Sequence, residues 1–398
     1  MSEVIAPARS LFAGLKPQAP DPLLSLITLY KNDPRPQKID LGVGVYRDAA
    51  GETPVFAAVK AAERLLLQAQ PTKAYLGPEG DLGFLDLMAP VVFGQGGSEG
   101  LIAVQTPGGT GALRLAAELA NAGTPGARIW MGAPSWPIHA PIFRQAGLAI
   151  ETFRYFDAAT QRLCFDEMIS ALSGVAAGDV VLLHGACHNP TGADLSLDQW
   201  REVAALLAAR GAVPLVDLAY QGLGDGLDAD AAGLRAVMEV SDRALIAYSC
   251  DKNFGLYRER TGALFVRAKG EEEVVRSNIL QLARCAWSMP PDHGAAVARV
   301  ILEDSELSAQ WRAELDGMRG RLNEVRQLLA DADPRLEPLR DQRGLFALLP
   351  LNPAQVEAMR RDHAVYMAGS GRINLAGLTT ATIQPFVQAL AACLQGDA

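Results

Sequence analysis

The chain has 398 residues, of which 49% are hydrophobic and 20% are charged, and its formal net charge at pH 7 is −9. This length predicts two lobes rather than one domain, and the negative charge argues against nucleic acids or anionic membranes as partners. No apolar run of membrane-spanning length and no basic leader stand out, and five scattered cysteines without metal or disulfide spacing predict a reduced, cytoplasmic protein.

Short apolar runs alternate with helical patterns between about residues 100 and 270. The expected strands are 101–104, 128–131, 179–183, 213–216 and 244–247, and one of the helices between them covers 197–209. This alternation predicts an α/β fold with a mostly parallel sheet and helices on both faces. Residues 306–332 then carry apolar side chains three and four positions apart, which predicts one long amphipathic helix, and the rest is compatible with a smaller α+β lobe.

A glycine-rich turn follows the strand expected at 101–104. It contains Gly108, Gly109 and Thr110 and leads into the helical pattern that begins at Ala112. Glycines let the backbone approach an anion, and a helix N-terminus offers free N–H groups, so a phosphate could bind here. A tight turn without a ligand is an equally good interpretation, because the segment matches neither the Walker motif nor the dinucleotide fingerprint.

Polar and aromatic side chains follow the next strands. Trp136 could stack on a flat ring, although core packing is the simpler interpretation. His184 and His188 are four residues apart but lack a third ligand that would indicate zinc, and Asn189 lies in a turn from which its amide could donate to a ligand.

Asp217 ends the apolar run 213–216, and Tyr220 follows three residues later. A carboxylate at the end of a buried strand is costly unless it meets a cationic partner. That partner is either an arginine of the protein, in a structural salt bridge, or a protonated nitrogen of a ligand.

Lys252 is the only lysine between Lys73 and Lys269, and it follows the apolar run 244–248. It therefore lies just past the carboxyl end of an expected strand, where open α/β sheets build their sites. Burial favours the neutral form of an amine, which can then attack a carbonyl. A general preference for arginine explains why lysine is scarce in this chain, but it does not explain this position.

Taken together, these motifs resemble those of the class I aminotransferases that use pyridoxal 5′-phosphate, specifically the aspartate and aromatic amino acid aminotransferases. The resemblance runs in order through 39–48, 107–111, 188–192, 252–255 and 370–372, so it covers nearly the whole chain. It implies the fold of the type I pyridoxal-phosphate transferases. We expect a large cofactor-binding domain of residues 51–314 and a small α+β domain that combines residues 1–50 with 315–398.

The resemblance also implies catalytic roles for Lys252, Asp217 and Tyr75. Lys252 matches the lysine that bonds covalently to the cofactor and later moves a proton during amino transfer. Asp217 matches the aspartate that pairs with the pyridine nitrogen and keeps it protonated, supported by imidazoles at His139 and His188.

The other implied roles concern binding. The residues that would hold the cofactor are Gly108, Gly109, Thr110, Trp136, Asn189, Asp217, Tyr220, Ser249, Lys252, Arg260 and, from the neighbouring subunit, Tyr75. The residues that would hold the substrate are Gly44, Trp136, Asn189, Arg284 and Arg372. Arg372 matches the arginine that binds the α-carboxylate, and Arg284 matches one that reaches across a homodimer with shared active sites to a side-chain carboxylate.

Three positions depart from the pattern of this family. Asp251 stands where relatives usually carry a serine that bonds to the phosphate, so it either turns toward Arg260 or weakens cofactor binding. Met289 replaces a polar residue, and His363 occupies a position that is usually aromatic, beside the α-carboxylate site.

Substrate preference is implied by smaller differences. Ala74 replaces the asparagine of aspartate-specific relatives, and the segments 249–262 and 15–21 look like the aromatic branch. We therefore expect a ping-pong transfer from aromatic (Tyr, Phe, Trp) and dicarboxylic (Asp, Glu) amino acids to a 2-oxo acid such as 2-oxoglutarate. The alternatives are a narrow aspartate aminotransferase, a decarboxylase or lyase on the same cofactor and, more remotely, a non-catalytic pyridoxal-binding regulator.

Overall fold

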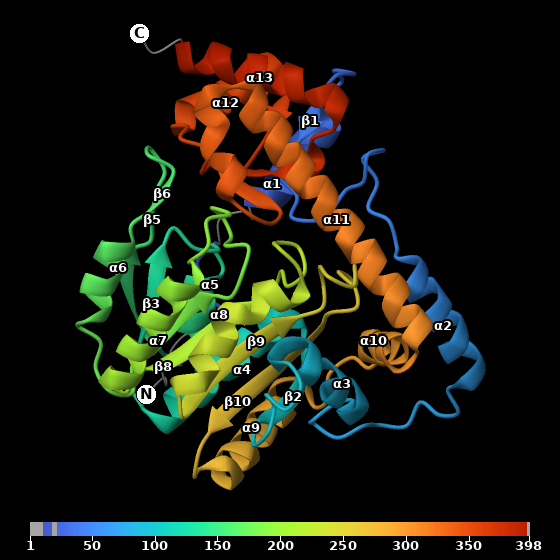
Figure 1. Ribbon diagram of the computed structural model, residues 1–398, viewed down its shortest axis with the longest axis vertical. Helices are drawn as coiled ribbons and strands as arrows, with labels where there is room; N and C mark the ends of the chain where they lie inside the picture. The colour runs from blue at the N-terminus through green and yellow to red at the C-terminus, as the bar shows by residue number, and fades with distance from the viewer. Residues whose placement is uncertain (1–10, 18–21, 396–398) are drawn as a thin grey trace, which may run out of the picture.

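The structure is a computed structural model that describes residues 11–17 and 22–395 (Figure 1). Residues 18–21 of the segment 15–21, which was assigned to the aromatic branch, lie outside the described residues. The helices are α1 (Pro22–Asn32), α2 (Ala57–Ala69), α3 (Leu82–Phe93), α4 (Gly108–Gly123), α5 (His139–Gln145), α6 (Phe165–Leu172), α7 (Leu197–Arg210), α8 (Leu227–Val240), α9 (Glu272–Trp287), α10 (His293–Glu303), α11 (Ser305–Ala332), α12 (Pro353–His363) and α13 (Thr380–Gln395), with the 3₁₀ helices η1 (Pro334–Asp341) and η2 (Leu375–Gly377).

A seven-stranded sheet forms the centre of the larger lobe. Its spatial order is β2 (Ile102–Pro107), β10 (Thr261–Ala268), β9 (Arg243–Ser249), β8 (Val213–Leu218), β7 (Val180–His184), β3 (Arg128–Ala133) and β4 (Ala149–Arg154). Only β10 runs antiparallel to its neighbours, β2 and β9. The expected mostly parallel sheet is therefore confirmed, with β4 and β10 added to the five expected strands.

Both faces of this sheet are covered by helices. Val181 and Val216 belong to the core shared with α3, α7 and α8, whereas their neighbours Leu182 and Leu215 belong to the core shared with α4, α5 and α9. Successive side chains of a strand point to opposite faces, so a strand buried on both faces reads as a continuous apolar run. This is why the central strands could be recognised as short runs of Val, Leu and Ile.

Local signals define α7, one of the covering helices. The Ser196 hydroxyl accepts from the Gln199 N–H at its start, and Gly211 ends the helix in a left-handed conformation with φ of 68°. Both features satisfy backbone groups that a helix terminus leaves unpaired. The helix expected at 197–209 is therefore confirmed, with one residue added at its end.

The long helix α11 runs from α10 to the second lobe, which contains α12, α13, α1 and β1 (Ile39–Asp40) (Figure 1). Its buried positions include Trp311, Leu315 and Leu322, as the apolar periodicity predicted. In the second lobe β1 (Ile39–Asp40) pairs with β12 (Val365–Tyr366), and β11 (Phe346–Leu348) pairs with β13 (Arg372–Asn374). A short hairpin of β5 (Phe156–Asp157) and β6 (Arg162–Leu163) completes the strands.

Across residues 11–17 and 22–395, no helix is both long and apolar enough to span a membrane.

Trp311 connects α11 to the segment that carries Lys252. Its side chain is fully buried, its Nε1 donates to the Asn253 carbonyl at 2.7 Å, and its ring stacks on Phe254 with centroids 4.3 Å apart. One tryptophan thereby holds the two residues that follow Lys252.

We expect Trp311→Ala to lower the free energy of unfolding by about 3–5 kcal/mol, because it leaves a large cavity. Trp311→Phe should cost about 1–3 kcal/mol, because it keeps most of the packing but leaves the Asn253 carbonyl without its donor. Urea unfolding at one protein concentration measures both, with Leu67→Ala, a change at a residue that is 88% exposed, as the control. If Trp311→Phe unfolded at the same urea concentration as wild type, the hydrogen bond from Trp311 to the Asn253 carbonyl would not contribute to stability.

Candidate active site

The candidate residues collect at one edge of the central sheet. Asn189 follows β7, Asp217 lies near the end of β8, and Ser249 ends β9. These strands are parallel, so their carboxyl ends meet at the same edge, where open α/β sheets bind ligands. The antiparallel strand β10 begins at this edge, and its first residue, Thr261, pairs with Pro107 of β2. This pairing brings Arg260 to the glycine-rich turn.

The glycine-rich turn and the start of α4 form an anion-binding corner. Gly108 has a φ of 68°, and a Cβ there would lie 2.6 Å from Nη2 of Arg260. A Cβ on Gly109 would lie 3.1 Å from the Ser249 side chain. The glycines therefore keep open a space that is bounded by a hydroxyl, a guanidinium and the first N–H groups of α4. Thr110, in the first turn of α4, is exposed. These groups suit a phosphate.

Asp217 is the anionic side of the site. Its Oδ2 is 3.0 Å from Nε2 of His139, and the Ser135 hydroxyl joins His139 Nδ1 to His184 Nε2 at 2.9 and 3.0 Å. Burial by itself would raise the pKa of Asp217, but the hydrogen bond from His139 and the charge of Lys252 are among the interactions that outweigh it, so the pKa lies below its usual value. The carboxylate stays ionised, and we find no hydrogen bond to its Oδ1 from the described residues.

The histidines behind Asp217 form a stack rather than a metal site. His188 stacks on His184 and Tyr155 with centroids 4.0 and 4.2 Å apart, and its Nδ1 bonds to the Thr191 hydroxyl. Burial lowers the pKa of both imidazoles, that of His184 to about 3, so both are neutral. His188 thus supports Asp217 only through its neighbours. Ser135 and His184, which the sequence did not single out for this role, complete the connection.

Lys252 interacts electrostatically with Asp217 and, at the anion corner, with Asp251 and Arg260. Its side chain is partly buried, and its Nζ is 5.2 Å from the centre of the Tyr220 ring. Burial lowers the pKa of this amine, although the charges of Asp251 and Asp217 oppose the shift. A larger fraction of Lys252 is therefore neutral and nucleophilic than in water.

Arg372 offers donors for a carboxylate. Its Nη1 donates to Asn189 Oδ1 at 3.3 Å and its Nη2 to the Gly42 carbonyl at 3.2 Å, while its Nε is buried without a hydrogen-bond partner. Burial lowers its pKa. The two hydrogen bonds of this guanidinium are long, and its buried Nε–H has no acceptor. It is therefore suited to bind a carboxylate through two of its nitrogens. Asn189 also donates to the Tyr220 hydroxyl at 3.3 Å.

The aromatic neighbour of Arg372 is a correction to the sequence analysis. We expected His363 beside this arginine, but His363 is exposed at the end of α12. The place is taken by Phe346, whose ring centre lies 4.4 Å from the guanidinium carbon. Phe346 also lies 3.2 Å from the point where a Cβ on Gly44 would stand, so the segment with Gly44 covers this part of the site.

Two candidates lie on the surface, away from this constellation. Tyr75 is 92% exposed in the segment between α2 and α3. Arg284 is exposed on α9 and donates to the Ser288 hydroxyl. Trp136 is partly exposed and lies edge-on to His139, with centroids 5.1 Å apart. Tyr75 and Arg284 therefore do not meet the other candidates within one chain.

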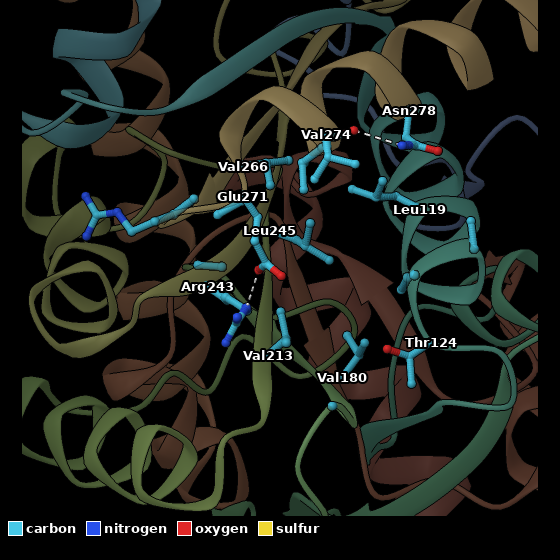
Figure 2. A pocket seen from close by; sticks show the side chains of 18 of the residues that line it. Leu119, Thr124, Val180, Val213, Arg243, Leu245, Val266, Glu271, Val274 and Asn278 are labelled. Atoms are coloured by element: carbon cyan, nitrogen blue, oxygen red, sulfur yellow. Dashed lines mark hydrogen bonds and ion pairs between the residues drawn. The ribbon is translucent and has the colours of Figure 1, made fainter.

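A cavity of about 640 Å³ lies elsewhere, at the amino ends of the central strands (Figure 2). Val180, Val213 and Leu245 line it, and Arg243 and Glu271 form an ion pair of 2.8 Å there. It contains none of the candidate residues, and its lining offers neither a nucleophile nor a glycine turn that opens a helix. The chemistry therefore points to the carboxyl edge.

Comparison with known proteins gives a consistent result. The profile of the family described as aminotransferase class I and II matches residues 36–390. A tyrosine aminotransferase of Rhizobium meliloti (strain 1021) is 56% identical over 93% of this chain and 97% of its own length. An aspartate aminotransferase of Escherichia coli (strain K12) is 42% identical over 96% of this chain and 100% of its own.

A solved structure has the same fold. The aromatic-amino-acid aminotransferase of Burkholderia pseudomallei, covalently bound to pyridoxal phosphate, superposes with a TM-score of 0.94 at 35% identity, over 97% of this chain and 100% of that one. The chain belongs to the class I and II aminotransferase family.

Proposed function

We propose that the protein is a pyridoxal 5′-phosphate-dependent aminotransferase for aromatic and dicarboxylic amino acids, with a 2-oxo acid such as 2-oxoglutarate as acceptor. The observation that carries this proposal is the electrostatic interaction of the Lys252 amine with an ionised carboxylate and with the anion corner. The cofactor has three groups with matching chemistry: a phosphate for the start of α4, Ser249 and Arg260, a pyridine nitrogen for Asp217, and an aldehyde for Lys252. When bound, it supplies a sink for the electrons left on the amino acid after loss of its α-proton.

Each residue then has a definite task. Lys252 would hold the cofactor through its aldehyde and would carry the α-proton of the substrate. Asp217 holds a proton on the pyridine nitrogen, because its pKa is low and His139 fixes its orientation. Arg372 orients the substrate through its α-carboxylate. Asn189 and Tyr220 would hold the phenolic oxygen of the cofactor, and Trp136 would lie against its ring.

We also propose a homodimer with shared active sites. Tyr75 and Arg284 are both exposed in the single chain, yet the resemblance places them in the site. A second subunit that contributes both residues reconciles these observations. We retain the division into a large domain of residues 51–314 and a small domain of 1–50 with 315–398. The five free cysteines, one of them exposed, support a reducing cytoplasmic location.

A narrow aspartate aminotransferase is the second candidate, because an aspartate aminotransferase is among the close relatives. The more similar tyrosine aminotransferase and the residues Ala74 and Met289 favour the broader activity. The non-catalytic regulator is disfavoured because Lys252, Asp217 and Arg372 are all in place.

We expect Lys252→Ala to fold normally but to lose at least about 10³-fold in turnover, because the chain loses both its nucleophile and its proton carrier. The measurement is glutamate formation from tyrosine or aspartate with 2-oxoglutarate. The matched control is Lys269→Ala, which removes a lysine whose side chain is 72% exposed. Wild-type rates in Lys252→Ala would refute the assignment.

We expect Asp217→Ala to bind cofactor but to slow the first half-reaction by about 10²–10³-fold, because the charge that stabilises the protonated pyridine nitrogen is gone. Asp217→Glu should retain part of the rate. Rapid mixing of the loaded proteins with amino acid alone measures the half-reaction, and absorbance gives their cofactor content. If cofactor affinity falls while the rate per bound cofactor is unchanged, Asp217 serves only to anchor the cofactor and does not contribute to the proton transfer.

We expect Arg284→Leu to lower kcat/KM for aspartate by about 10²-fold or more, because a clamp on the second carboxylate is lost. Tyrosine and phenylalanine should lose far less, because the arginine is flexible and its stem can pack against a ring. Arg276→Leu, the same change at another exposed position of α9, is the control. No wild-type activity with aromatic amino acids, or equal losses for both classes, would favour the narrow aspartate enzyme.

A further inference from the structure

The anion corner contains a carboxylate that a phosphate site does not need. Asp251 is 3% exposed, and its Oδ2 lies 3.1 Å from the point where a Cβ on Gly108 would stand. Its Oδ1 accepts from the Thr261 N–H at 3.3 Å, and its own N–H donates to the Ser249 hydroxyl at 3.2 Å. The side chain is thus fixed beside the same turn that would receive the phosphate, and it does not point away from it.

Asp251 also engages the cation of the corner. Its Oδ2 is 2.5 Å from Nη1 of Arg260, and the same nitrogen donates to the Tyr257 carbonyl at 3.1 Å. The Arg260 backbone is held in the left-handed region with φ of 53°, so the start of this side chain is constrained. Only the far side of the guanidinium, with Nη2 next to Gly108, faces the turn. The nearest positive charge to an incoming phosphate is therefore already paired with an anion.

We propose that Asp251 is an internal counter-ion of Arg260 that competes with the cofactor phosphate and weakens its binding. This inference rests on the proposed function, since it concerns the cofactor of that reaction. The Asp251 carboxylate and the phosphate are both negative and lie against one turn, where the partial charge of the α4 N-terminus and a neutralised Arg260 are left to oppose their repulsion. Repulsion between charges is stronger in a site from which water is excluded.

A weakly held phosphate has a consequence for the catalytic cycle. In the aldehyde form, the covalent bond to Lys252 retains the cofactor even if its phosphate is held weakly. In the aminated form that bond is absent, and retention depends on non-covalent contacts, including those of the phosphate. We therefore expect the protein to release its cofactor after the first half-reaction and to require free pyridoxal 5′-phosphate for sustained turnover.

The test compares two ligands that cannot bond covalently to Lys252. Pyridoxamine 5′-phosphate and pyridoxamine, which differ only in the phosphate, are titrated into cofactor-free full-length protein by tryptophan fluorescence. The proteins are wild type, Asp251→Ser and the isosteric Asp251→Asn. The matched control is Asp333→Ser, which removes a buried aspartate that pairs with Arg335 at the same 2.5 Å but precedes η1 as its N-cap residue.

We expect Asp251→Ser and Asp251→Asn each to bind pyridoxamine 5′-phosphate at least about tenfold more tightly than wild type, as expected for removal of a buried charge beside the phosphate. Pyridoxamine affinity should stay within about twofold, and Asp333→Ser should match wild type for both ligands. In parallel, wild-type holoenzyme incubated with glutamate alone and then desalted should lose most of its cofactor, whereas Asp251→Ser should retain it.

Equal or weaker binding of pyridoxamine 5′-phosphate by both Asp251 variants would overturn the inference, since Asp251 would then be needed to hold Arg260 in place. Equal tightening of both ligands would overturn it too, because the effect would not act through the phosphate. If wild type and both Asp251 variants bind neither ligand, the proposed function itself fails. If wild type binds pyridoxamine 5′-phosphate but the Asp251 variants bind it no more tightly, the inference about Asp251 is overturned and the proposed function stands.

Discussion

The site depends on keeping a carboxylate ionised and an amine nucleophilic at the buried edge of one sheet. Asp217 is ionised because His139 donates to it, and Ser135 and His184 hold that imidazole in place. Burial also lowers the pKa of the Lys252 amine, which favours its neutral form. Without the histidine, burial would raise the pKa of the carboxyl, and the pyridine nitrogen of a bound cofactor would have a weaker partner. The remaining groups of the site are arranged around this pair.

The topology explains how residues far apart in sequence reach that edge. Parallel strands bring Asn189, Asp217 and Ser249 to it from three successive β–α units. One reversal, the antiparallel β10, returns the chain to the same edge and delivers Arg260 next to the turn after β2. The second lobe adds Arg372 from β13 and Phe346 from β11, which pair with each other as neighbouring strands. The substrate carboxylate would therefore bind where the two lobes meet.

Much of this could be predicted from the sequence, for a physical reason. Central strands buried on both faces appear as apolar runs, and the residue after each run is placed at the sheet edge by geometry alone. The strand β4 was missed because it is an edge strand whose residues 149–154 are mostly not buried and form neither a continuous apolar run nor a regular alternation. The strand β10 is apolar and buried throughout most of its length, but it follows the site segment so closely that its first residues were interpreted only as part of a motif.

Contacts between the lobes were harder to predict. The sequence offered His363 as the neighbour of Arg372, yet Phe346 fills that place, because the pairing of β11 with β13 sets the distance and not the separation along the chain. The role of Ser135 and His184 in holding His139 was missed, because a hydrogen-bond relay leaves no periodic signal; His184 had been considered only as a possible zinc ligand. Tyr75 and Arg284 are exposed here, and a single chain carries no information about what covers them.

The most direct test of the central claim is the site of cofactor attachment. The purified protein is treated with borohydride, which reduces the bond between a lysine amine and the cofactor aldehyde to a stable form, and is then digested and mapped by mass spectrometry. The account predicts a single pyridoxyl phosphate label on Lys252 and loss of the near-visible absorbance band. A label on any other lysine, or no label on protein that carries the cofactor, would contradict it.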